Sequence, residues 1–473
     1  MRTGFPRTAR AFLAAAALGP LLSACGGGSS ADASPGVTPE NGSGEMGPVA
    51  MPEEGTGSCS TEDQNAWVYD NMLDYYLFYD QVPIVDPSTF DSPRDLLRAV
   101  RFEERDPFSF ITAADASDLA FEEGREFGLG YNWGEDGDGV PRITRVITDS
   151  PFGRAGIERG DIIVEIAGRP ALEALTDRDF FEETVLGTPD APGDASWTFT
   201  RRDSGARLTE RFVATEYAID TVRHVETYAN GEYDGVIGYF FFDRFLETSE
   251  AEIFDVFAEF AEAGVTDLVL DLRYNRGGRI SVARQLATLA LDNGQPGAVL
   301  QSYRYNDKYA ATENFELRVD DELAGLGLRS LVVLATDSTA SSSEIVAGGL
   351  APLMNVSVIG PSRTSGKPYI QRGRDRCGER LNAIEAEAFN AAGESVFGGI
   401  VPDCHADDDR LSDFGQNPET GVFEGMLLAG LDRVAFGTCE LFVEDRARGV
   451  GARGEGWTGQ GSVATGGALL DGS

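Results

Sequence analysis

Apolar side chains recur at two different spacings along the chain, and the longest helical pattern lies in residues 249–263. There the apolar residues fall on one face of a helix, and Gly264 follows directly as a typical stop. Ser249 and Glu252 have the spacing of a capping box. We therefore predict a helix that begins at Ser249 and ends before Gly264.

Short, continuous apolar runs lie before and after this helix, and such runs are typical of buried strands. A second helical pattern covers residues 280–291, and a third begins near Glu344. Strands that alternate with helices predict an α/β domain built from successive strand–helix units. The predicted strands are residues 236–242, 268–270, 331–335 and 356–359.

The N-terminal half of the chain has a different pattern. Residues 67–79 carry apolar and aromatic side chains at helical spacing, and residues 96–100 predict a second short helix. From Phe127 onward short apolar runs alternate with glycine turns, as in residues 143–146 and 160–168. We predict a small helical N-terminal unit followed by a β-rich domain.

Both ends of the chain have few large apolar side chains. Residues 26–58 are rich in glycine, serine, proline and acidic residues, and the chain beyond Arg446 is rich in glycine. Such segments bury too little apolar surface to offset the entropy of ordering. We therefore predict a disordered linker at one end and a disordered tail at the other.

The first 24 residues have the pattern of a targeting segment. Three arginines precede residues 11–22, an apolar stretch too short to span a membrane as an ordinary helix. Residues 22–25 (Leu-Ser-Ala-Cys) resemble a bacterial lipobox, which implies cleavage before Cys25 and lipidation of its thiol. No aspartate follows Cys25, which indicates the outer membrane by the bacterial retention rule. A plain secretory peptide with a chance cysteine is the alternative.

The chain is strongly acidic, with a formal net charge of −39. A surface of this charge repels nucleic acid and anionic membrane faces, and it favours solubility. We therefore expect no nucleic-acid partner.

Beyond the lipobox the chain has four cysteines: Cys59, Cys377, Cys404 and Cys439. An even number in an exported chain predicts two disulfides, for which three pairings exist. A preference for closing short loops, taken alone, favours Cys377–Cys404, which leaves Cys59 to pair with Cys439. A metal site at Cys377, Cys404 and His405 is a weaker alternative because it lacks close C-x-x-C spacing.

Lysine is rare: two of the 39 basic residues are lysines, Lys308 and Lys367. Unlike arginine, lysine can lose its proton and act as a base. Lys367 lies 26 residues after Ser341, the first of three consecutive serines. A serine nucleophile with a lysine base needs only these two side chains. Because the two histidines, His224 and His405, lack serine-protease context, the sequence favours a Ser/Lys hydrolase.

Three loops of the α/β domain carry the candidate chemistry. Residues 271–278 (Asp-Leu-Arg-Tyr-Asn-Arg-Gly-Gly) leave a predicted strand and enter a helix, and glycines there let backbone N–H groups face a bound oxygen. Residues 341–345 (Ser-Ser-Ser-Glu-Ile) and 365–371 (Ser-Gly-Lys-Pro-Tyr-Ile-Gln) follow the next two predicted strands. Ser341 and Glu344 also have the spacing of a helix cap, so neither residue is diagnostic by itself.

The β-rich region is similar to a PDZ domain of the bacterial protease type. The similarity rests on Ser-Pro at residues 150–151, Ala-Gly-Ile at 155–157 and Gly-Asp-Ile-Ile at 160–163, in that order. Converging backbone N–H groups of a glycine loop can hold a peptide carboxylate, and an exposed strand beside the loop can accept an added strand. The resemblance places this loop at Phe127, Gly128, Leu129 and Gly130.

Taken together, the three loops resemble the C-terminal processing peptidases, also called tail-specific proteases. The order of the motifs, the PDZ-like region before them and a late Gly-Ile-Val-Pro-Asp at residues 399–403 all match that family over roughly residues 65–440. The resemblance implies an α/β multi-domain protein with a small helical N-terminal unit, a PDZ-like domain and an ααβ-sandwich peptidase core.

The resemblance also assigns roles to individual residues. It implies that Ser341 is the nucleophile, that Lys367 is the general base and that Gln371 orients this lysine. It implies an oxyanion hole made by the backbone N–H groups of Gly278 and Ser342. Ser342 and Ser343 remain alternative nucleophiles. The resemblance implies no cofactor and no metal.

Two positions depart from the family pattern. The spacing from Ser341 to Lys367 is one residue longer than usual, and the loop between them can absorb it. Arg276 stands where glycine is common, which places a bulky cation near the substrate.

We therefore predict a lipid-anchored serine endopeptidase on the periplasmic face of a bacterial cell envelope. Its partners would be proteins or peptides with accessible C-termini, and assembly as a homo-oligomer is compatible with the family. A catalytically inactive adaptor that binds protein tails is the main alternative, and a Ser/Lys hydrolase of another fold is a third. The predicted segments are a signal peptide 1–24, a linker 25–58, a helical unit 59–117, a PDZ-like domain 118–216, a peptidase core 217–445 and a tail 446–473.

Overall fold

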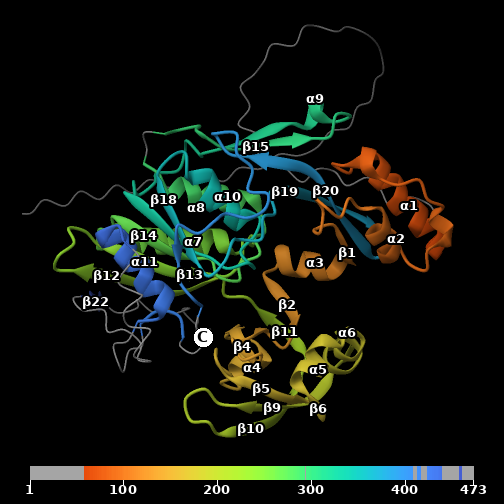
Figure 1. Cartoon of the computed structure of the whole chain (residues 1–473), viewed down its shortest axis with the longest axis horizontal. Helices are drawn as coiled ribbons and strands as arrows, with labels where there is room; N and C mark the ends of the chain where they lie inside the picture. The colour runs from red at the N-terminus through yellow and green to blue at the C-terminus, as the bar shows by residue number, and fades with distance from the viewer. Residues whose placement is uncertain (1–57, 293–294, 409–412, 417–422, 439–456, 461–473) are drawn as a thin grey trace, which may run out of the picture. The chain divides into compact units, whose positions relative to one another are not determined.

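The largest sheet of the computed structural model, which describes residues 58–292, 295–408, 413–416, 423–438 and 457–460, has seven strands (Figure 1). Five of its strands are parallel and continuous in order, and two antiparallel strands extend one edge. The order is β21 (Cys404–His405), β18 (Asn355–Gly360), β17 (Ser330–Leu334), β14 (Asp267–Asp271), β13 (Ile237–Phe242), β12 (Val222–Asn230) and β22 (Trp457–Gln460).

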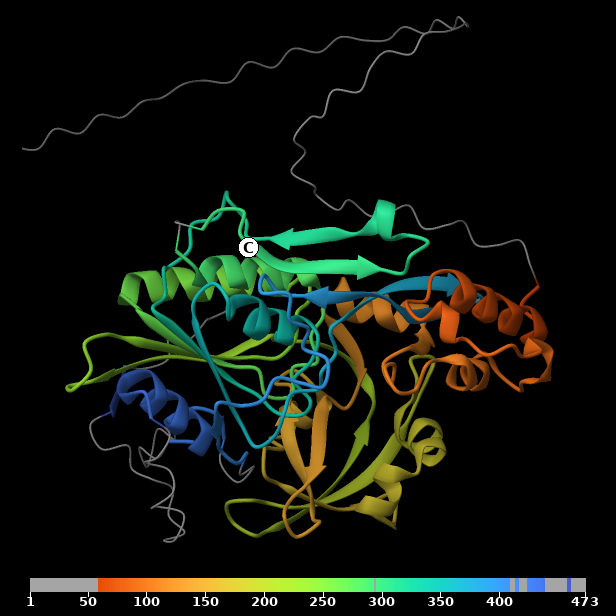
Figure 2. The ribbon, with the colours of Figure 1, turned by 45° about the horizontal axis from the view of Figure 1, so that its top comes forward.

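Helices cover both faces of this sheet because its central strands are apolar on both sides. One face packs against three helices, α7 (Ser249–Ala263), α8 (Ile280–Ala290) and α10 (Ser342–Leu350). The other face packs against α11 (Gly425–Phe436). Helices α8 and α10 also contact a second sheet on the far side, and the helices lie between the two sheets (Figure 2).

The second sheet joins the N-terminal helices to the core. Its strands are β1 (Phe110–Ala113), β20 (Glu379–Phe389), β15 (Val299–Tyr305), β16 (Phe315–Arg318) and the hairpin partner β19 (Tyr369–Arg376). Helices α1 (Thr61–Asp74) and α2 (Pro93–Val100) pack on β19 and β20 through one apolar cluster, and short turns η1 (Tyr79–Gln81), η2 (Pro87–Thr89) and α9 (Ala310–Glu313) complete this region. The N-terminal helices therefore pack on β19, the strand that carries Gln371.

A separate β-rich layer follows the linker helix α3 (Ala114–Phe121). Its core is aromatic, with Phe152, Trp197 and Phe199 fully buried. Its sheet has the order β10 (Arg207–Val213), β9 (Asp194–Thr200), β5 (Ile162–Ile166), β4 (Pro141–Val146) and β3 (Tyr131–Glu135), with β6 (Arg169–Pro170) on β5. The remaining elements are β2 (Arg125–Gly128), paired with β11 (Thr215–Ala218), the hairpin β7 (Gly187–Thr188) and β8 (Ala191–Pro192), and α4 (Pro151–Arg154), α5 (Ala171–Thr176), α6 (Arg178–Phe180) and η3 (Phe181–Leu186).

The predicted strands and helices of the α/β domain are confirmed, including a helix over residues 249–263 that ends at Gly264 in the left-handed conformation. The predicted capping box is wrong, since α7 has no side-chain cap. The Ser249 hydroxyl donates to the carbonyl of Arg244, and the Glu252 carboxylate accepts the backbone N–H groups of Thr221 and Val222 instead. The partners of Glu252 come from a distant segment, which sequence spacing cannot reveal.

Two further expectations need correction. Residues 67–79 do not form one helix, since α1 begins at Thr61 and ends at Asp74. The helix starts earlier than predicted because Ser60 caps it. The tail is not wholly disordered, because the strand Trp457–Gln460 pairs with β12. Main-chain pairing of this kind depends on a free sheet edge rather than on apolar composition.

The disulfide of the described region joins Cys59 to Cys377, so both favoured pairings are wrong. Cys377 lies in the turn between β19 and β20, on which α1 packs, and this fold brings it to Cys59 across 318 residues. The preference for short loops gave the wrong pairing because the β19–β20 hairpin was not predicted. Cys25 and Cys439 lie outside the described residues, as do the signal peptide and nearly all of the linker. Among the helices that the structure describes, none is long and apolar enough to cross a membrane.

Candidate active site

The three predicted loops meet at the carboxyl ends of β14, β17 and β18, because parallel strands place these ends at one edge of the sheet. They surround a cavity of about 860 Å³. The structure brings Ser341, Lys367, Gln371 and Gly278 to the wall of this cavity, whereas His224 and His405 do not line it.

Ser341 is the residue before the first turn of α10. Its backbone has φ +57° and ψ −116°, a conformation that non-glycine residues rarely adopt and that is often found at functional sites. A Cβ atom on Gly277 would lie 2.8 Å from the Cβ of Ser341 and from the N atom of Ser342. Only glycine lets the loop at residues 271–278 approach the serine this closely.

Two backbone N–H groups are available beside Ser341. In the described part of the chain, those of Gly278 and Ser342 have no protein acceptor. Gly278 has φ +146°, and a Cβ atom there would lie 2.1 Å from the carbonyl oxygen of Phe245, so this position requires glycine. Free N–H groups at a helix start beside a serine are suited to bind an oxyanion.

The two neighbouring serines are engaged in structural hydrogen bonds. The buried Ser342 hydroxyl donates to the carbonyl of Gly278 at 2.8 Å, and the buried Ser343 hydroxyl donates to the carbonyl of Asn275 at 3.0 Å. Both bonds hold the loop at residues 271–278 against α10. These contacts favour Ser341 over Ser342 and Ser343 as the nucleophile.

Gln371 holds the amine of Lys367 in place. The Nζ atom of Lys367 donates to Oε1 of Gln371 at 2.6 Å, while Nε2 of Gln371 donates to the carbonyls of Phe108 at 2.8 Å and Asn382 at 2.9 Å. Because the amide nitrogen has both of these acceptors, the amide oxygen must face the lysine. No hydrogen bond joins Lys367 to the Ser341 hydroxyl in the described structure, as is common before a substrate binds.

The surroundings of Lys367 favour its neutral form. Burial lowers the pKa of Lys367 to about 8, and the charges of Asp106 and Glu344 oppose this shift. Asp106 is fully buried, and its Oδ1 atom accepts the N–H groups of Phe108 and Ser109. Its Oδ2 atom has no hydrogen-bond partner within the described residues. The N-terminal unit therefore contributes both the carbonyl that orients Gln371 and a charge that acts on Lys367.

Glu344 ties the backbones of Ser341 and Lys367 to one atom. Its Oε2 accepts the N–H of Ser341 and the N–H of Lys367, each at 2.9 Å. Its Oε1 accepts the Thr364 hydroxyl at 2.5 Å and the Gly366 N–H at 2.8 Å. This carboxylate is 1% exposed, and burial raises its pKa. Glu344 thus fixes the relative positions of two backbone segments.

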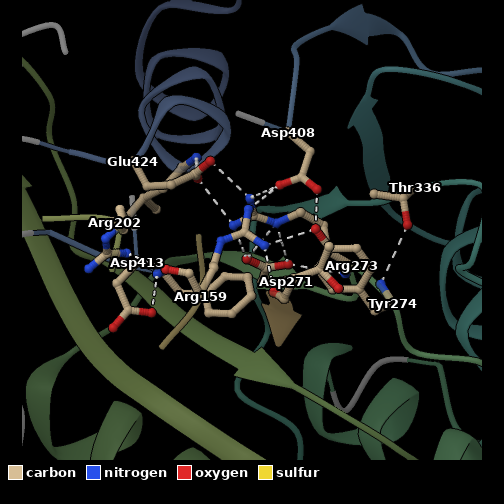
Figure 3. A network of polar contacts seen from close by, with 12 residues as sticks. Arg159, Arg202, Asp271, Arg273, Tyr274, Thr336, Asp408, Asp413 and Glu424 are labelled. Carbon is tan, nitrogen blue, oxygen red and sulfur yellow. Dashed lines mark hydrogen bonds and ion pairs between the residues drawn. The ribbon is translucent and has the colours of Figure 1, made fainter. Parts of the chain in front are cut away.

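A buried polar network lies beneath the loop at residues 271–278 (Figure 3). Arg273, which is fully buried, pairs with Asp271 at 2.5 Å and with Glu424 at 2.9 Å. Arg159 of the β-rich layer pairs with Asp408 and donates to the hydroxyl of Tyr274 at 2.9 Å. The network therefore joins the β-rich layer to the loop that carries Gly278.

The charges in this network shift one carboxyl strongly. Burial would raise the pKa of Asp408, but Arg159 and Arg273 hold it well below its usual range. Because Asp408 is ionised, both arginines keep a partner.

A second cavity, of about 360 Å³, lies beside the predicted carboxylate-binding loop. The loop supplies Phe127, Gly128, Leu129 and Gly130 to its wall. Leu175, Phe181 and Leu186 supply apolar side chains, and β3 borders it as an edge strand. Asn132 and Arg145 line both this cavity and the larger one. The arrangement can hold an extended peptide whose last side chain is apolar.

No group of three or more His, Cys, Asp or Glu side chains in the described region could hold a metal ion.

Comparison with known proteins identifies the parts of the chain. Residues 236–406 match peptidase family S41, residues 63–110 match the peptidase S41 N-terminal domain and residues 142–180 match a PDZ domain. The chain is similar to the CtpA-like serine protease of Staphylococcus aureus (strain bovine RF122 / ET3-1), with 25% identity over 68% of the chain, and spans 61% of that relative. It is 28% identical to the chloroplastic C-terminal processing peptidase of Tetradesmus obliquus, over 68% of the chain and 69% of that protein.

One solved structure has the same fold. It is a protein of Bacteroides fragilis NCTC 9343 described as an S41 protease, with a TM-score of 0.60 and 22% identity, and the match covers 78% of this chain and 96% of that structure. The predicted α/β multi-domain fold with a small helical N-terminal region is confirmed.

The sequence did not identify two residues that the structure places at the site. Glu344 was interpreted only as a helix cap. Its contact with the Ser341 N–H fits that cap, but three further groups, from Thr364, Gly366 and Lys367, also bind it. Asp106 precedes Pro107 in a polar turn, and no sequence signal distinguished it from a surface aspartate. A buried acid beside a rare lysine becomes visible only when the N-terminal unit is placed on the core.

Proposed function

We propose that this chain is a serine endopeptidase in which Ser341 is the nucleophile and Lys367 is the general base. The observation that carries the proposal is the fixed amide of Gln371. Its nitrogen is held by two backbone carbonyls, so its oxygen faces a lysine whose pKa burial lowers to about 8. At pH 7 a lysine with this pKa is neutral in about one molecule in ten, far more often than an ordinary lysine with a pKa near 10.4.

The reaction follows from these groups. The Ser341 hydroxyl gives its proton to neutral Lys367 as its oxygen attacks the scissile carbonyl carbon. The backbone N–H groups of Gly278 and Ser342 bind the resulting oxyanion. The tetrahedral intermediate then loses the amine, which takes the proton back from Lys367. Water, activated by the same lysine, hydrolyses the acyl-enzyme and restores Ser341.

We also propose that the PDZ-like domain binds the C-terminal tail of a protein substrate. The edge strand β3 offers unpaired backbone groups, and the loop from Phe127 to Gly130 offers the converging N–H groups that a terminal carboxylate needs. Apolar walls from Leu175 and Phe181 favour an apolar last residue.

Lipidation of Cys25 and a place on the periplasmic face of the cell envelope complete the proposal. Its support is the lipobox-like Leu-Ser-Ala-Cys of residues 22–25. Cys25→Ser should move the protein from the membrane fraction to the soluble fraction. A chain that stays soluble in both forms would contradict the anchor without touching the chemistry.

The chemistry is tested with residues 26–473 and casein, an unfolded protein substrate. Ser341→Ala and Lys367→Ala should each abolish cleavage. Ser338→Ala and Lys308→Ala are matched controls, since Ser338 precedes the nucleophile by three residues and Lys308 is the other lysine of the chain. Circular dichroism should show all four variants folded.

Three outcomes separate the alternatives. Cleavage that is lost only in Ser341→Ala and Lys367→Ala supports the Ser/Lys peptidase. Cleavage that persists in both contradicts the assignment of the catalytic residues. Binding of peptides with apolar C-termini, without cleavage of any of them, favours the tail-binding adaptor.

A further inference from the structure

The wall of the larger cavity is unexpectedly basic for so acidic a chain. Six basic side chains line it against two acidic ones, Asp118 and Glu122, although the whole chain carries a net charge of −39. Charges beyond about 10 Å are largely screened at physiological salt, so the local side chains decide which substrate charge is accepted.

Most of these basic groups already have partners. Arg145 pairs with Asp243, and Arg244 pairs with Glu126. The remaining paired groups are Arg279 with Glu247 at 2.9 Å, Arg380 with Asp375 at 2.6 Å, and Lys367 with Gln371 at 2.6 Å. Because their donors are occupied, these groups have little capacity to bind a substrate anion.

Arg276 is different. Within the described residues it has no ion pair and no hydrogen bond to its guanidinium, and its side chain is exposed in the cavity. It stands directly before Gly277, which packs against Ser341, and two residues before Gly278. The guanidinium is therefore attached within two residues of the N–H group that would bind the oxyanion.

We infer that Arg276 selects peptide substrates that carry a carboxylate within one or two residues of the scissile bond. This inference rests on the proposed peptidase function and adds the substrate class. A guanidinium presents two parallel N–H donors that match a carboxylate, and the pairing strengthens as the bound peptide excludes water from the cavity. The carboxylate can belong to a Glu or Asp side chain or to the C-terminus of a short substrate. Replacing Glu with Gln removes the first, and amidation of the C-terminus removes the second.

The experiment measures kcat/KM for a matched set of peptides. Each peptide has the same sequence apart from one position, which is Glu, Gln or Lys and is moved through the two residues on either side of the cleaved bond. Each is made with a free and with an amidated C-terminus. Wild type should cleave the best Glu peptide about tenfold faster than its Gln counterpart, as a hydrogen bond to a charged group implies. If kcat/KM instead falls when the C-terminus is amidated and does not depend on Glu or Gln at the varied position, the terminal carboxylate is the group that Arg276 binds.

Two variants and a control assign the preference to Arg276. Arg276→Ala should make the Glu and Gln peptides equivalent, and Arg276→Glu should favour the Lys peptide. Arg279→Ala is the matched control, because this arginine lines the same cavity but already pairs with Glu247. The ratio between Glu and Gln peptides should change less than twofold in the control.

The result that overturns the inference is a wild-type enzyme that cleaves Glu, Gln, Lys and amidated peptides at equal kcat/KM. A ratio that survives in Arg276→Ala overturns it as well. If the wild type cleaves nothing, the proposed function fails, and the inference is still tested by fluorescence anisotropy of the same labelled peptides on Ser341→Ala. Equal affinity for Glu and Gln peptides there contradicts a carboxylate site at Arg276.

Discussion

In the proposed reaction Lys367 must be neutral to accept the proton of Ser341, and its surroundings set the fraction of neutral lysine at a given pH. Burial lowers its pKa to about 8, so the fraction of neutral lysine rises with pH through this value. We therefore expect kcat/KM to be low at pH 6 and to rise to a plateau above pH 9, with a midpoint near pH 8. A profile that is flat from pH 6 to 9 would show that no group with this pKa controls the free enzyme.

Replacing Asp106 with asparagine should move this midpoint to lower pH. The negative charge of Asp106 raises the pKa of Lys367 against the effect of burial, so its removal leaves the neutral amine more favoured. Asparagine keeps an oxygen that can accept the N–H groups of Phe108 and Ser109. The pH dependence of kcat/KM measures the shift. Asp138→Asn, at an exposed position, should leave the midpoint unchanged.

The opposite shift is expected for Gln371→Glu. A carboxylate in place of the amide oxygen would favour charged Lys367, so the midpoint should move to higher pH and activity at pH 7 should fall. The same profiles serve as the measurement. A midpoint that moves down in both Asp106→Asn and Gln371→Glu would contradict the electrostatic account, because the two changes alter the local charge in opposite directions.

At the scale of elements, Glu344 connects α10 to the loop between β18 and β19. Glu344→Gln keeps the shape of the side chain but replaces one of its two acceptor oxygens with a donor, so two of the four groups that it binds lose their partner. Buried groups left unpaired cost roughly 1–3 kcal/mol each, and we expect a loss of about 3 kcal/mol in the free energy of unfolding.

Urea unfolding followed by circular dichroism measures this loss. Glu322→Gln is the control, since Glu322 is exposed, and it should change stability by less than about 0.5 kcal/mol. Equal stability of Glu344→Gln and the wild type would mean that the four contacts do not hold the two segments together.

Elements whose pattern is local were predictable from the sequence. The helix that ends at Gly264 and the buried strands carry their signals within a few residues, so their positions agree with the structure. The loops with Ser341 and Lys367 could be placed because each follows such a strand. Their meeting at one cavity follows from parallel pairing, which brings the carboxyl ends of β17 and β18 to one edge.

Features that depend on distant partners could not be predicted in this way. The β19–β20 hairpin turns at Cys377 and Gly378, both with positive φ, and its pairing with β1 brings the N-terminal unit to Gln371. The disulfide with Cys59 and the contact of Phe108 with Gln371 both depend on that hairpin. A non-glycine residue with positive φ has no reliable sequence signal, so the turn and everything attached to it were missed.

At the scale of the whole molecule, a single arginine connects the PDZ-like domain to the base of the active-site loop. Arg159 pairs with Asp408, donates to the Tyr274 hydroxyl at 2.9 Å and donates to the Thr144 carbonyl of its own domain at 2.7 Å (Figure 3). Tyr274 lies in the same loop as Gly278 and has φ +66°. The position of Gly278, one of the two proposed oxyanion donors, therefore depends partly on a residue of the PDZ-like domain.

Arg159→Ala should lower both stability and activity. It removes one partner of a buried ion pair, which typically costs 3–5 kcal/mol; because Asp408 keeps Arg273 at 3.2 Å, we expect about 3 kcal/mol. The exposed pair of Arg178 and Glu182 provides the control, and Arg178→Ala should cost less than about 0.5 kcal/mol. Urea unfolding measures both losses.

Because the loop also carries Gly278, kcat should fall in Arg159→Ala under conditions in which the protein stays folded. KM for short peptides that do not reach the PDZ-like domain should stay the same. A fall in stability with unchanged kcat would mean that Arg159 joins the domains but does not support the oxyanion donor.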